Sequence, residues 1–264
     1  MKIGFRHLCA AVLTMTALAG PASAEGHIFI ASDSTAADYK PDWYPQMGWG
    51  MLLKCNLTDG VKVENRAIGG RSTKTFISEG RFDAIAHDIT PGDTLLIQFG
   101  HNDTNDKKPE RFTPVPEYKV NLQRFVAMAR DKGAVPVLIT PVALRRFDDN
   151  GAIGESLTPY VEATREIAHA TATPLIDLNY DSRVYFQQVG AEASKAYYMN
   201  FDKEAGYARW PDGLSDNVHF SELGARAVAA LVAKRLKELN LPISTHVAPV
   251  PAENPPRLGN PSCS

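Results

Sequence analysis

Apolar residues occur in short runs along the chain, and polar segments rich in turn residues separate these runs. Two of the runs, 94–99 and 135–140, are almost continuously apolar, as is typical of strands that are covered on both faces. Three shorter runs complete the pattern. We therefore predict five buried strands, at residues 27–31, 61–66, 94–99, 135–140 and 174–178.

Helical patterns lie between and after the predicted strands. One apolar face recurs at helical spacing, at Tyr118, Leu122, Phe125 and Ala129. Its helix is predicted to begin at Pro116 and to end before Gly133. Three further helices are predicted at about 158–171, from a Ser182 cap to about 194, and from a Ser221 cap to about 239. Alternation of this kind indicates the α/β class, with a parallel sheet and helices on both of its faces.

The alternating pattern ends near residue 240. Residues 243–264 contain five prolines and no apolar period, so we expect 241–264 to form an extended or disordered tail. No low-complexity linker divides the rest of the chain, which favours a single domain over residues 25–240.

The first 24 residues have the pattern of a secretory signal peptide. A basic start is followed by an apolar run from Leu8 to Leu18 and by an Ala-x-Ala site that ends at Ala24. The apolar run is too short to anchor the protein in a bilayer. We expect cleavage after Ala24 and a secreted or periplasmic protein.

The charge balance bears on the choice of partner. The whole chain has 28 basic and 30 acidic residues, and cleavage removes Lys2 and Arg6 but no acid, which leaves a net charge of −4. An excess of acid argues against nucleic acid or an anionic membrane as the natural partner. We expect neither, and we expect a monomer.

Two cysteines remain after cleavage, Cys55 and Cys263. An exported protein permits a disulfide between them, but the sequence alone leaves open whether they pair. No group of Cys and His residues has the spacing of a zinc site.

In a parallel sheet with helices on both faces, ligands bind beyond the carboxyl ends of the strands. The residues after each predicted strand are therefore the candidates for chemistry. They are Asp33-Ser34 after the first strand, Gly69-Gly70-Arg71-Ser72 after the second and Gly100-His101-Asn102-Asp103 after the third.

A carboxylate and an imidazole precede the last helix, at Asp216 and His219, close enough for the first to orient the second. Each feature also has an ordinary explanation, since Ser34 could begin a helix cap and a Gly pair is common in turns. Together they supply a hydroxyl nucleophile, a base, an orienting acid and oxyanion donors, which are the roles that acyl transfer requires.

In this order, Asp33-Ser34, Gly70, Gly100-His101-Asn102-Asp103 and Asp216-x-x-His219 resemble the motifs of the SGNH or GDSL hydrolase superfamily. The longer stretches 65–72, 79–82 and 98–103 are similar to those of rhamnogalacturonan acetylesterases, and the resemblance extends over about residues 27–239. It implies a three-layer, flavodoxin-like fold with a five-stranded parallel sheet. It also implies removal of acetyl groups from pectin, with no metal or organic cofactor.

The resemblance assigns a role to each matching residue. It implies that Ser34 is the nucleophile and that His219 and Asp216 are the base and the acid. The backbone N–H of Ser34, Gly70 and the Asn102 side chain are implied as oxyanion donors. The sequence departs from the family pattern at Ser32, which stands where a glycine is usual and puts the geometry of this turn in question.

An acidic polysaccharide would favour basic and aromatic groups near the crevice. The candidates after the strands are Arg71, Arg145 and Arg146, although charges in such loops are often only solvated. Trp210, shortly before Asp216, is the candidate for stacking on a sugar, whereas Trp49 is expected to pack beneath the nucleophile turn.

Three alternatives remain open from the sequence. The same machinery could act on another ester, such as acetylxylan, a lipid or a thioester, although the loops are polar rather than apolar. A non-catalytic carbohydrate-binding protein would lack one of the required roles, and none is missing. A nucleotide-binding protein is disfavoured because Asp33 would repel a phosphate.

Overall fold

The computed structural model describes residues 26–249 and 257–263, so the predicted signal peptide lies outside the described residues. A five-stranded sheet with the order β2-β1-β3-β4-β5 forms its centre, and all neighbouring strands are parallel. The strands are β1 (Ile28–Ser32), β2 (Val63–Asn65), β3 (Thr94–Gln98), β4 (Val135–Ile139) and β5 (Leu175–Ile176). The predicted five-stranded parallel α/β fold is confirmed.

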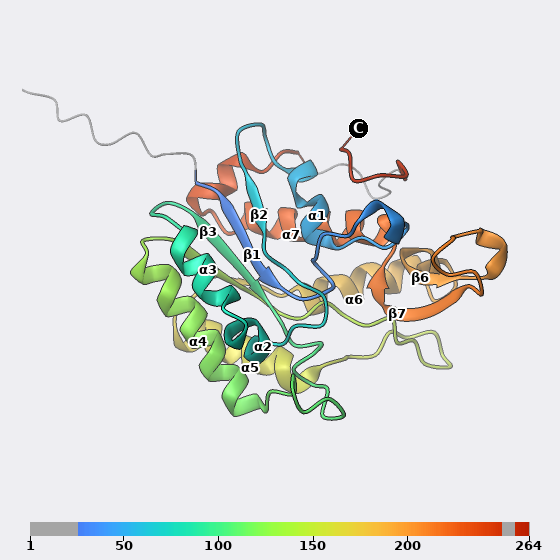
Figure 1. Ribbon diagram of the computed structural model, residues 1–264, viewed down its shortest axis with the longest axis horizontal. Helices are drawn as coiled ribbons and strands as arrows, with labels where there is room; N and C mark the ends of the chain where they lie inside the picture. Colours follow the sequence, from blue (N-terminus) through green and yellow to red (C-terminus); the bar gives the residue numbers. More distant parts are fainter. Residues whose placement is uncertain (1–25, 250–256, 264) are drawn as a thin grey trace, which may run out of the picture.

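Helices cover both faces of the sheet, which gives three layers (Figure 1). Successive residues of a strand point to opposite faces, so Ile28 and Ile30 pack in one core while Phe29 and Ala31 pack in the other. The first core includes α1 (Trp49–Leu53), α6 (Leu178–Val189) and α7 (Glu222–Glu238). The second includes α2 (Thr73–Ser78), α3 (Arg81–Asp88), α4 (Val115–Asp131) and α5 (Thr158–Ala170). Since β1 and β3 are buried along their whole length, their continuous apolar runs are explained.

The bounds of α4, α5 and α7 agree with the prediction to within a few residues, but those of α6 do not. The Ser182 cap and the helix end near 194 were wrong. Asp177 is the N-cap, because its side chain accepts a hydrogen bond from the backbone N–H of Tyr180. Ser182 is buried inside the helix, where its hydroxyl donates to the Leu178 carbonyl at 2.6 Å. The helix therefore begins one turn earlier than the serine suggested.

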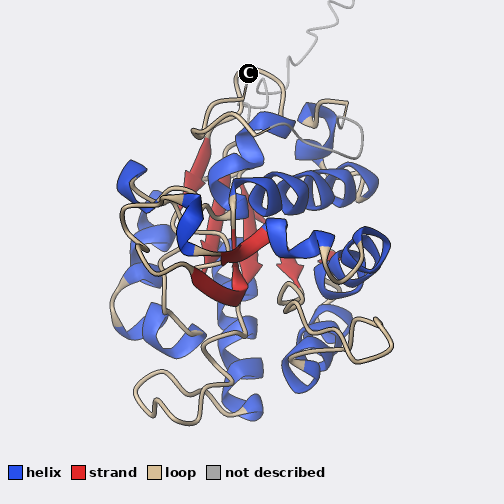
Figure 2. Ribbon diagram, turned by 90° about the vertical axis from the view of Figure 1, so that its right-hand side faces the viewer, coloured by secondary structure: helices blue, strands red, loops and turns tan. Residues whose placement is uncertain are grey.

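A second, smaller sheet was not predicted. It consists of β6 (Tyr198–Phe201) and β7 (Leu214–Phe220), which pair antiparallel. In Figure 1 this hairpin lies to the right of the parallel sheet, and Figure 2 shows it in front of the larger sheet's strands. Since β7 contains both Asp216 and His219, the hairpin presents these residues to the end of β1.

The C-terminal segment is more ordered than predicted. Pro242–His246 forms a 3-10 helix, and Ile243 and Val247 are buried in the core. Cys55 and Cys263 form a disulfide, which answers the question that the sequence left open. The expectation of an extended or disordered tail was therefore wrong for residues 242–247, whereas residues 257–263 contain no helix or strand, as an extended segment would.

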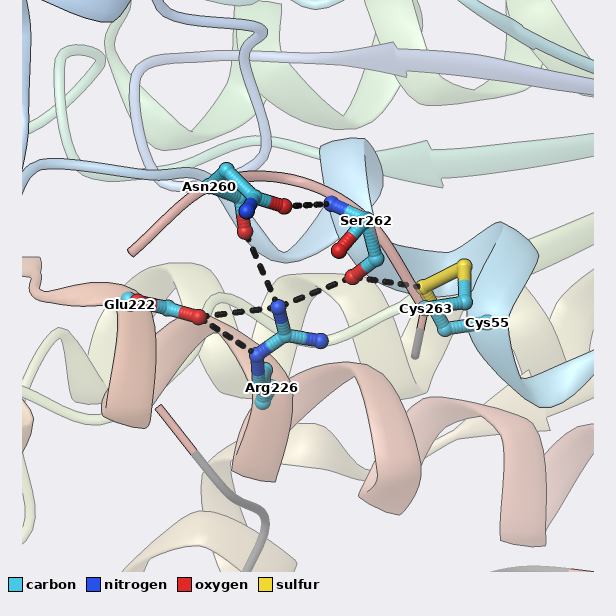
Figure 3. Close-up of a disulfide and its surroundings, with 6 residues drawn as sticks. All are labelled: Cys55, Glu222, Arg226, Asn260, Ser262 and Cys263. Carbon is cyan, nitrogen blue, oxygen red and sulfur yellow. Dashed lines mark hydrogen bonds and ion pairs between the residues drawn. A yellow bond between two sulfur atoms is a disulfide. The ribbon is translucent and has the colours of Figure 1, made fainter. Parts of the chain in front are cut away.

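Polar contacts hold the end of the chain against α7 (Figure 3). Arg226 and Glu222 form a buried ion pair at 2.8 Å. Arg226 donates to the carbonyls of Asn260 and Ser262, at 3.0 and 2.9 Å. The Glu222 carboxylate accepts from the backbone N–H groups of Leu258 and Gly259, at 2.7 and 2.9 Å. These contacts satisfy backbone groups of a segment that has no apolar pattern of its own. Within residues 26–249 and 257–263, no helix has the length and apolar character needed to cross a membrane.

Candidate active site

Ser34 lies in the turn that follows β1, and His219 faces it from β7. The His219 Nε2 atom lies 2.9 Å from the Ser34 hydroxyl oxygen, although 185 positions separate the two residues in the chain. The His219 Nδ1 atom lies 2.7 Å from Asp216 Oδ2. The structure thus brings together the three residues that the sequence singled out as nucleophile, base and acid.

Asp216 is fixed relative to the imidazole. Its Oδ1 atom accepts hydrogen bonds from the backbone N–H groups of Val218 and His219, at 2.7 and 3.0 Å. Burial alone would raise the pKa of Asp216, but the hydrogen bond and the charge of His219 outweigh burial and leave this pKa below its usual value. A carboxylate that is ionised at neutral pH favours a proton on Nδ1 of His219. Nε2 is then free to accept the proton of the Ser34 hydroxyl.

Two elements support the strand that bears Asp216 and His219. Asn200 of β6 donates through its side chain to the Asp216 carbonyl at 2.9 Å. The backbone N–H of Arg145, in the loop after β4, donates to the Asn217 carbonyl at 2.9 Å. The parallel sheet and the hairpin are therefore joined next to the base.

The loops after β2 and β3 bring possible anion donors to the same place. A side chain at Gly69 would put its Cβ 3.7 Å from the Ser34 Cβ, so this loop lies directly beside the nucleophile. Gly70 has a φ of +80°, a conformation that favours glycine. The Asn102 side chain is 9% exposed and donates one N–H to the Arg71 carbonyl at 3.1 Å. The loops that carry Gly70 and Asn102 thus meet at the Arg71 carbonyl, and the first of these loops lies beside Ser34.

Ser32 is accommodated without backbone strain. Its φ is not in the left-handed region, where a glycine would be required. Its side chain is fully buried, and its hydroxyl oxygen has no hydrogen-bond partner among the described residues. A serine therefore fits the turn geometrically, at the cost of a buried hydroxyl with no partner.

A buried hydrogen-bond network underlies the nucleophile turn. Asp33 Oδ1 accepts from the backbone N–H and the hydroxyl of Thr35, at 2.9 and 2.8 Å. Gln98 donates to the same hydroxyl at 2.9 Å and accepts from the Trp49 indole at 2.8 Å. Trp49 is fully buried, so the expectation that it packs beneath this turn is confirmed.

His101 completes this network from the loop after β3. Its Nε2 atom lies 3.0 Å from the Val142 carbonyl, which can only accept, so Nε2 carries a proton. Its Nδ1 atom lies 3.4 Å from Asp33 Oδ2 and has no other partner within the described chain. Burial would raise the pKa of Asp33, but the charge of and hydrogen bond from His101 lower it below its usual value.

Asp103 joins the two loops that carry Gly70 and Asn102. It accepts from the backbone N–H and hydroxyl of Thr73, at 2.9 and 2.6 Å, and from the N–H of Gly100 at 3.1 Å. Its carboxyl is fully buried, and burial raises its pKa to about 7 against the effect of these donors.

The raised pKa of Asp103 predicts a pH dependence of stability. Between about pH 4 and pH 7 the folded protein retains a proton that the unfolded chain has lost, so the free energy of unfolding should fall as the pH rises. Asp103→Asn removes the titrating group. The slope of unfolding free energy against pH should therefore become less negative by up to about 1.4 kcal/mol per pH unit, the value for one proton. Urea unfolding of both proteins at a series of pH values measures the difference. The asparagine side chain of the variant also lowers stability by an amount that does not depend on pH. The slope is therefore the quantity to compare, and equal slopes in the two proteins would contradict the prediction.

The proposed substrate-binding residues differ in how free their side chains are. Arg71 is bound to Glu79 at 3.0 Å and to the Gly69 carbonyl at 2.9 Å. Arg145 donates to Ser194 and Asn217, at 3.0 and 3.1 Å, and also to the Ala191 carbonyl. Arg146 is exposed, and its side chain has no hydrogen bond or ion pair within the described part of the chain. The sequence could not separate a guanidinium that supports the fold from one that is free to bind a ligand.

Trp210 is half-buried in an aromatic cluster on the hairpin loop. Its ring lies 5.9 Å from that of Phe201, and the Arg209 guanidinium lies between it and Trp43, 3.5 Å from the Trp43 ring centre. The Trp43 ring is in turn 5.6 Å from Tyr39, whose hydroxyl donates to the Ser34 carbonyl at 2.9 Å. A continuous series of contacts thus leads from the nucleophile turn to Trp210.

Sequence reasoning missed a further residue at the site. Arg111, in the loop between β3 and α4, donates to the Asn102 side chain at 2.8 Å. It lies outside any motif, and only its distance of nine positions from Asn102 relates the two in the sequence. No periodicity or spacing could have revealed it.

Comparison with known proteins identifies the family and several relatives of this chain. The family model of the GDSL-like lipase/acylhydrolase family matches residues 33–227. A rhamnogalacturonan acetylesterase of Bacillus subtilis, RhgT, is 44% identical over 220 residues, which are 83% of this chain and 93% of that protein. A rhamnogalacturonan acetylesterase of Emericella nidulans is 41% identical over 200 residues, 68% of this chain and 78% of that protein.

Solved structures share the fold. The crystal structure of the Bacillus subtilis protein YxiM superposes with a TM-score of 0.70 at 31% identity and covers 81% of this chain and 56% of that one. An acetylxylan esterase from Geobacillus stearothermophilus has a TM-score of 0.54 at 18% identity and covers 83% of this chain and 95% of that one. At that identity the likeness concerns the fold alone.

Proposed function

Since this chain belongs to the GDSL-like lipase/acylhydrolase family and is a carboxylic ester hydrolase, we propose that it removes O-acetyl groups from the pectic polysaccharide rhamnogalacturonan. One observation carries the chemistry: the hydrogen-bonded series from Ser34 through His219 to Asp216. The substrate is proposed from the relatives, which are named for that activity.

Ser34 attacks the acetyl carbonyl while Nε2 of His219 takes the hydroxyl proton. Asp216 holds the imidazole and stabilises its positive charge. Collapse of the tetrahedral intermediate breaks the bond to the sugar oxygen, which leaves with the proton from His219, and the acetyl group remains on Ser34. A water molecule then loses a proton to His219 and attacks the acetyl-enzyme, which releases acetate and restores the serine.

Three donors hold the negative oxygen of the intermediate in this proposal. They are the backbone N–H of Ser34, the backbone N–H of Gly70 and the Asn102 side chain. Two observations support this assignment: the loop of Gly69 and Gly70 lies beside Ser34, and the second N–H of the Asn102 amide has no partner in the described structure. Such preorganised donors contribute to catalysis because they bind charge that develops only in the transition state.

The free Arg146 side chain is the best candidate for a contact with a uronate carboxylate. Arg146→Ala should raise KM for an acetylated acidic oligosaccharide by about twofold to fivefold, as expected for one exposed charge contact. The same variant should hydrolyse p-nitrophenyl acetate at the wild-type rate. Steady-state kinetics on both substrates measures the effect, and Lys132→Ala, which removes an exposed charge at the far end of β4, is the matched control. Equal losses on the two substrates would refute a role in binding.

The substrate is tested by measuring acetate release from acetylated rhamnogalacturonan, homogalacturonan and xylan. The wild-type protein should release acetate fastest from rhamnogalacturonan, and Ser34→Ala should release almost none from any of them. Faster release from xylan would overturn the pectic substrate and leave the esterase mechanism in place.

Export is also part of this proposal. The signal-peptide pattern of residues 1–24 supports it, and so does the Cys55–Cys263 disulfide, since disulfides persist in oxidising compartments. A polysaccharide substrate outside the cytoplasm fits both observations.

A further inference from the structure

The Arg111 guanidinium lies against both of the side-by-side oxyanion donors. Its Nη1 atom donates to Asn102 Oδ1 at 2.8 Å. The same atom lies 3.4 Å from the position that a Cβ would take on Gly70. The Arg111 side chain is 21% exposed, and its ion partner Glu110, at 3.7 Å, is 65% exposed. The Arg111 guanidinium therefore lies closer to the proposed oxyanion site than to Glu110, the acidic residue that could neutralise its charge.

Hydrogen bonds decide which way the Asn102 amide points. The two ends of an asparagine amide have nearly the same size and shape, so packing alone distinguishes them poorly. Arg111 can only donate, so it holds the Oδ1 end. The Nδ2 end then faces the Arg71 carbonyl at 3.1 Å with one hydrogen, which leaves the other for an anion. Without Arg111, only the Arg71 carbonyl would select this orientation, and a half-turn of the amide would present an oxygen to the developing negative charge.

The loop that carries Arg111 is anchored. The Arg111 backbone N–H donates to the Lys108 carbonyl at 3.0 Å. Its carbonyl accepts from the hydroxyl of Thr113 at 3.2 Å, and the Thr113 backbone N–H donates to the Asp103 carbonyl at 3.0 Å. The buried Tyr160 hydroxyl donates to the carbonyls of both Asp103 and Thr113, at 3.0 and 2.7 Å. Arg111 thus reaches Asn102 from a support tied to the same loop.

We propose that Arg111 is a positioning residue of the oxyanion site, which holds the Asn102 amide with its second N–H toward the anion. This inference rests on the proposed acyl-transfer function. It predicts an effect on the chemical step, since the amide contacts the transition state and Arg111 acts through it.

The test is a double-mutant cycle on p-nitrophenyl acetate. Asn102→Ala should lower kcat by about 100- to 1000-fold, the loss typical of one oxyanion donor. Arg111→Met should lower kcat by about 2- to 10-fold with little change in KM, because kcat falls with the fraction of molecules whose Asn102 amide presents its N–H, and equal populations of the two orientations already halve that fraction. Arg111→Lys, which retains a donor, should recover part of this loss. In the Asn102→Ala background, Arg111→Met should have no further effect on kcat.

A purely structural role makes different predictions. Arg130→Met is the matched control, since Arg130 also bridges distant segments, donating to the Thr171 carbonyl at 2.8 Å, but lies on α4 away from Ser34. It should lower the melting temperature without changing kcat. An unchanged kcat in Arg111→Met, or a loss that adds fully to that of Asn102→Ala, would overturn the inference. A wild-type protein that hydrolyses p-nitrophenyl acetate but no acetylated pectin would overturn only the proposed substrate.

Discussion

Replacing Ser34 with alanine should lower kcat for acetyl-ester hydrolysis by about 10⁴-fold or more, the scale of loss when the nucleophile of a Ser-His-Asp group is removed. The hydroxyl is the only group of the protein that bonds to the acetyl carbon in the proposed mechanism, and alanine preserves the backbone N–H. Any remaining activity would reflect the oxyanion donors and substrate binding. Hydrolysis of p-nitrophenyl acetate measures the loss, and thermal unfolding verifies that the variant is folded.

The chain offers a matched control two residues away. Ser32 ends β1, and its buried hydroxyl has no partner within the described chain. Ser32→Ala removes the same atoms from the same turn and should leave kcat within about twofold, with stability unchanged or slightly higher. If Ser32→Ala were the inactive variant and Ser34→Ala the active one, the proposed nucleophile would be wrong.

Loss of the disulfide should have the largest effect on stability. Cys55 and Cys263 are 208 positions apart, so their bond restricts nearly the whole unfolded chain. The chain-entropy model gives about 5 kcal/mol for a loop of this size, and measured losses for native disulfides are about 2–5 kcal/mol. Cys263→Ser should lower the free energy of unfolding by an amount in that range, as measured by urea denaturation.

The contacts in Figure 3 provide the control for the disulfide prediction. Arg226 and Glu222 bind the backbone of residues 258–262 without the sulfur atoms. Cys55→Ser, Cys263→Ser and the double variant should therefore have the same stability, because each leaves these contacts and removes only the covalent bond. A free energy of unfolding equal to that of the wild type would show that the polar contacts alone hold the segment.

Much of the fold followed from hydrophobic patterning because the parallel strands are buried on both faces. The strand Thr94–Gln98 is an example, since all of its residues are buried and an almost continuous apolar run predicted it. The hairpin was missed because six of the seven residues of β7 are half-buried or exposed, so no continuous apolar run marks the strand. The contacts of residues 258–262 were missed because they depend on Arg226 and Glu222, whose partners are backbone groups that no sequence pattern marks.

The site could be located because parallel topology brings the ends of β1, β2 and β3 to one edge. Ser34, Gly70 and Asn102 follow these three strands, so their proximity is a consequence of the fold class. Arg111 could not be found in this way, since its role depends on a side-chain contact within an irregular loop. The same limit applies to Arg71 and Arg145, whose hydrogen bonds appear only once the chain is folded.

The nucleophile and its base belong to parts of the molecule with very different burial. Ser34 follows a strand whose five residues are all buried, whereas β7 has one buried residue among its seven. Segments with many exposed backbone hydrogen bonds open locally at a lower free energy than the core does. Opening of the hairpin alone would separate His219 from Ser34 while the parallel sheet remained intact. A molecule with an open hairpin would be folded but would lack its base, so local opening of the hairpin would lower activity without unfolding the parallel sheet.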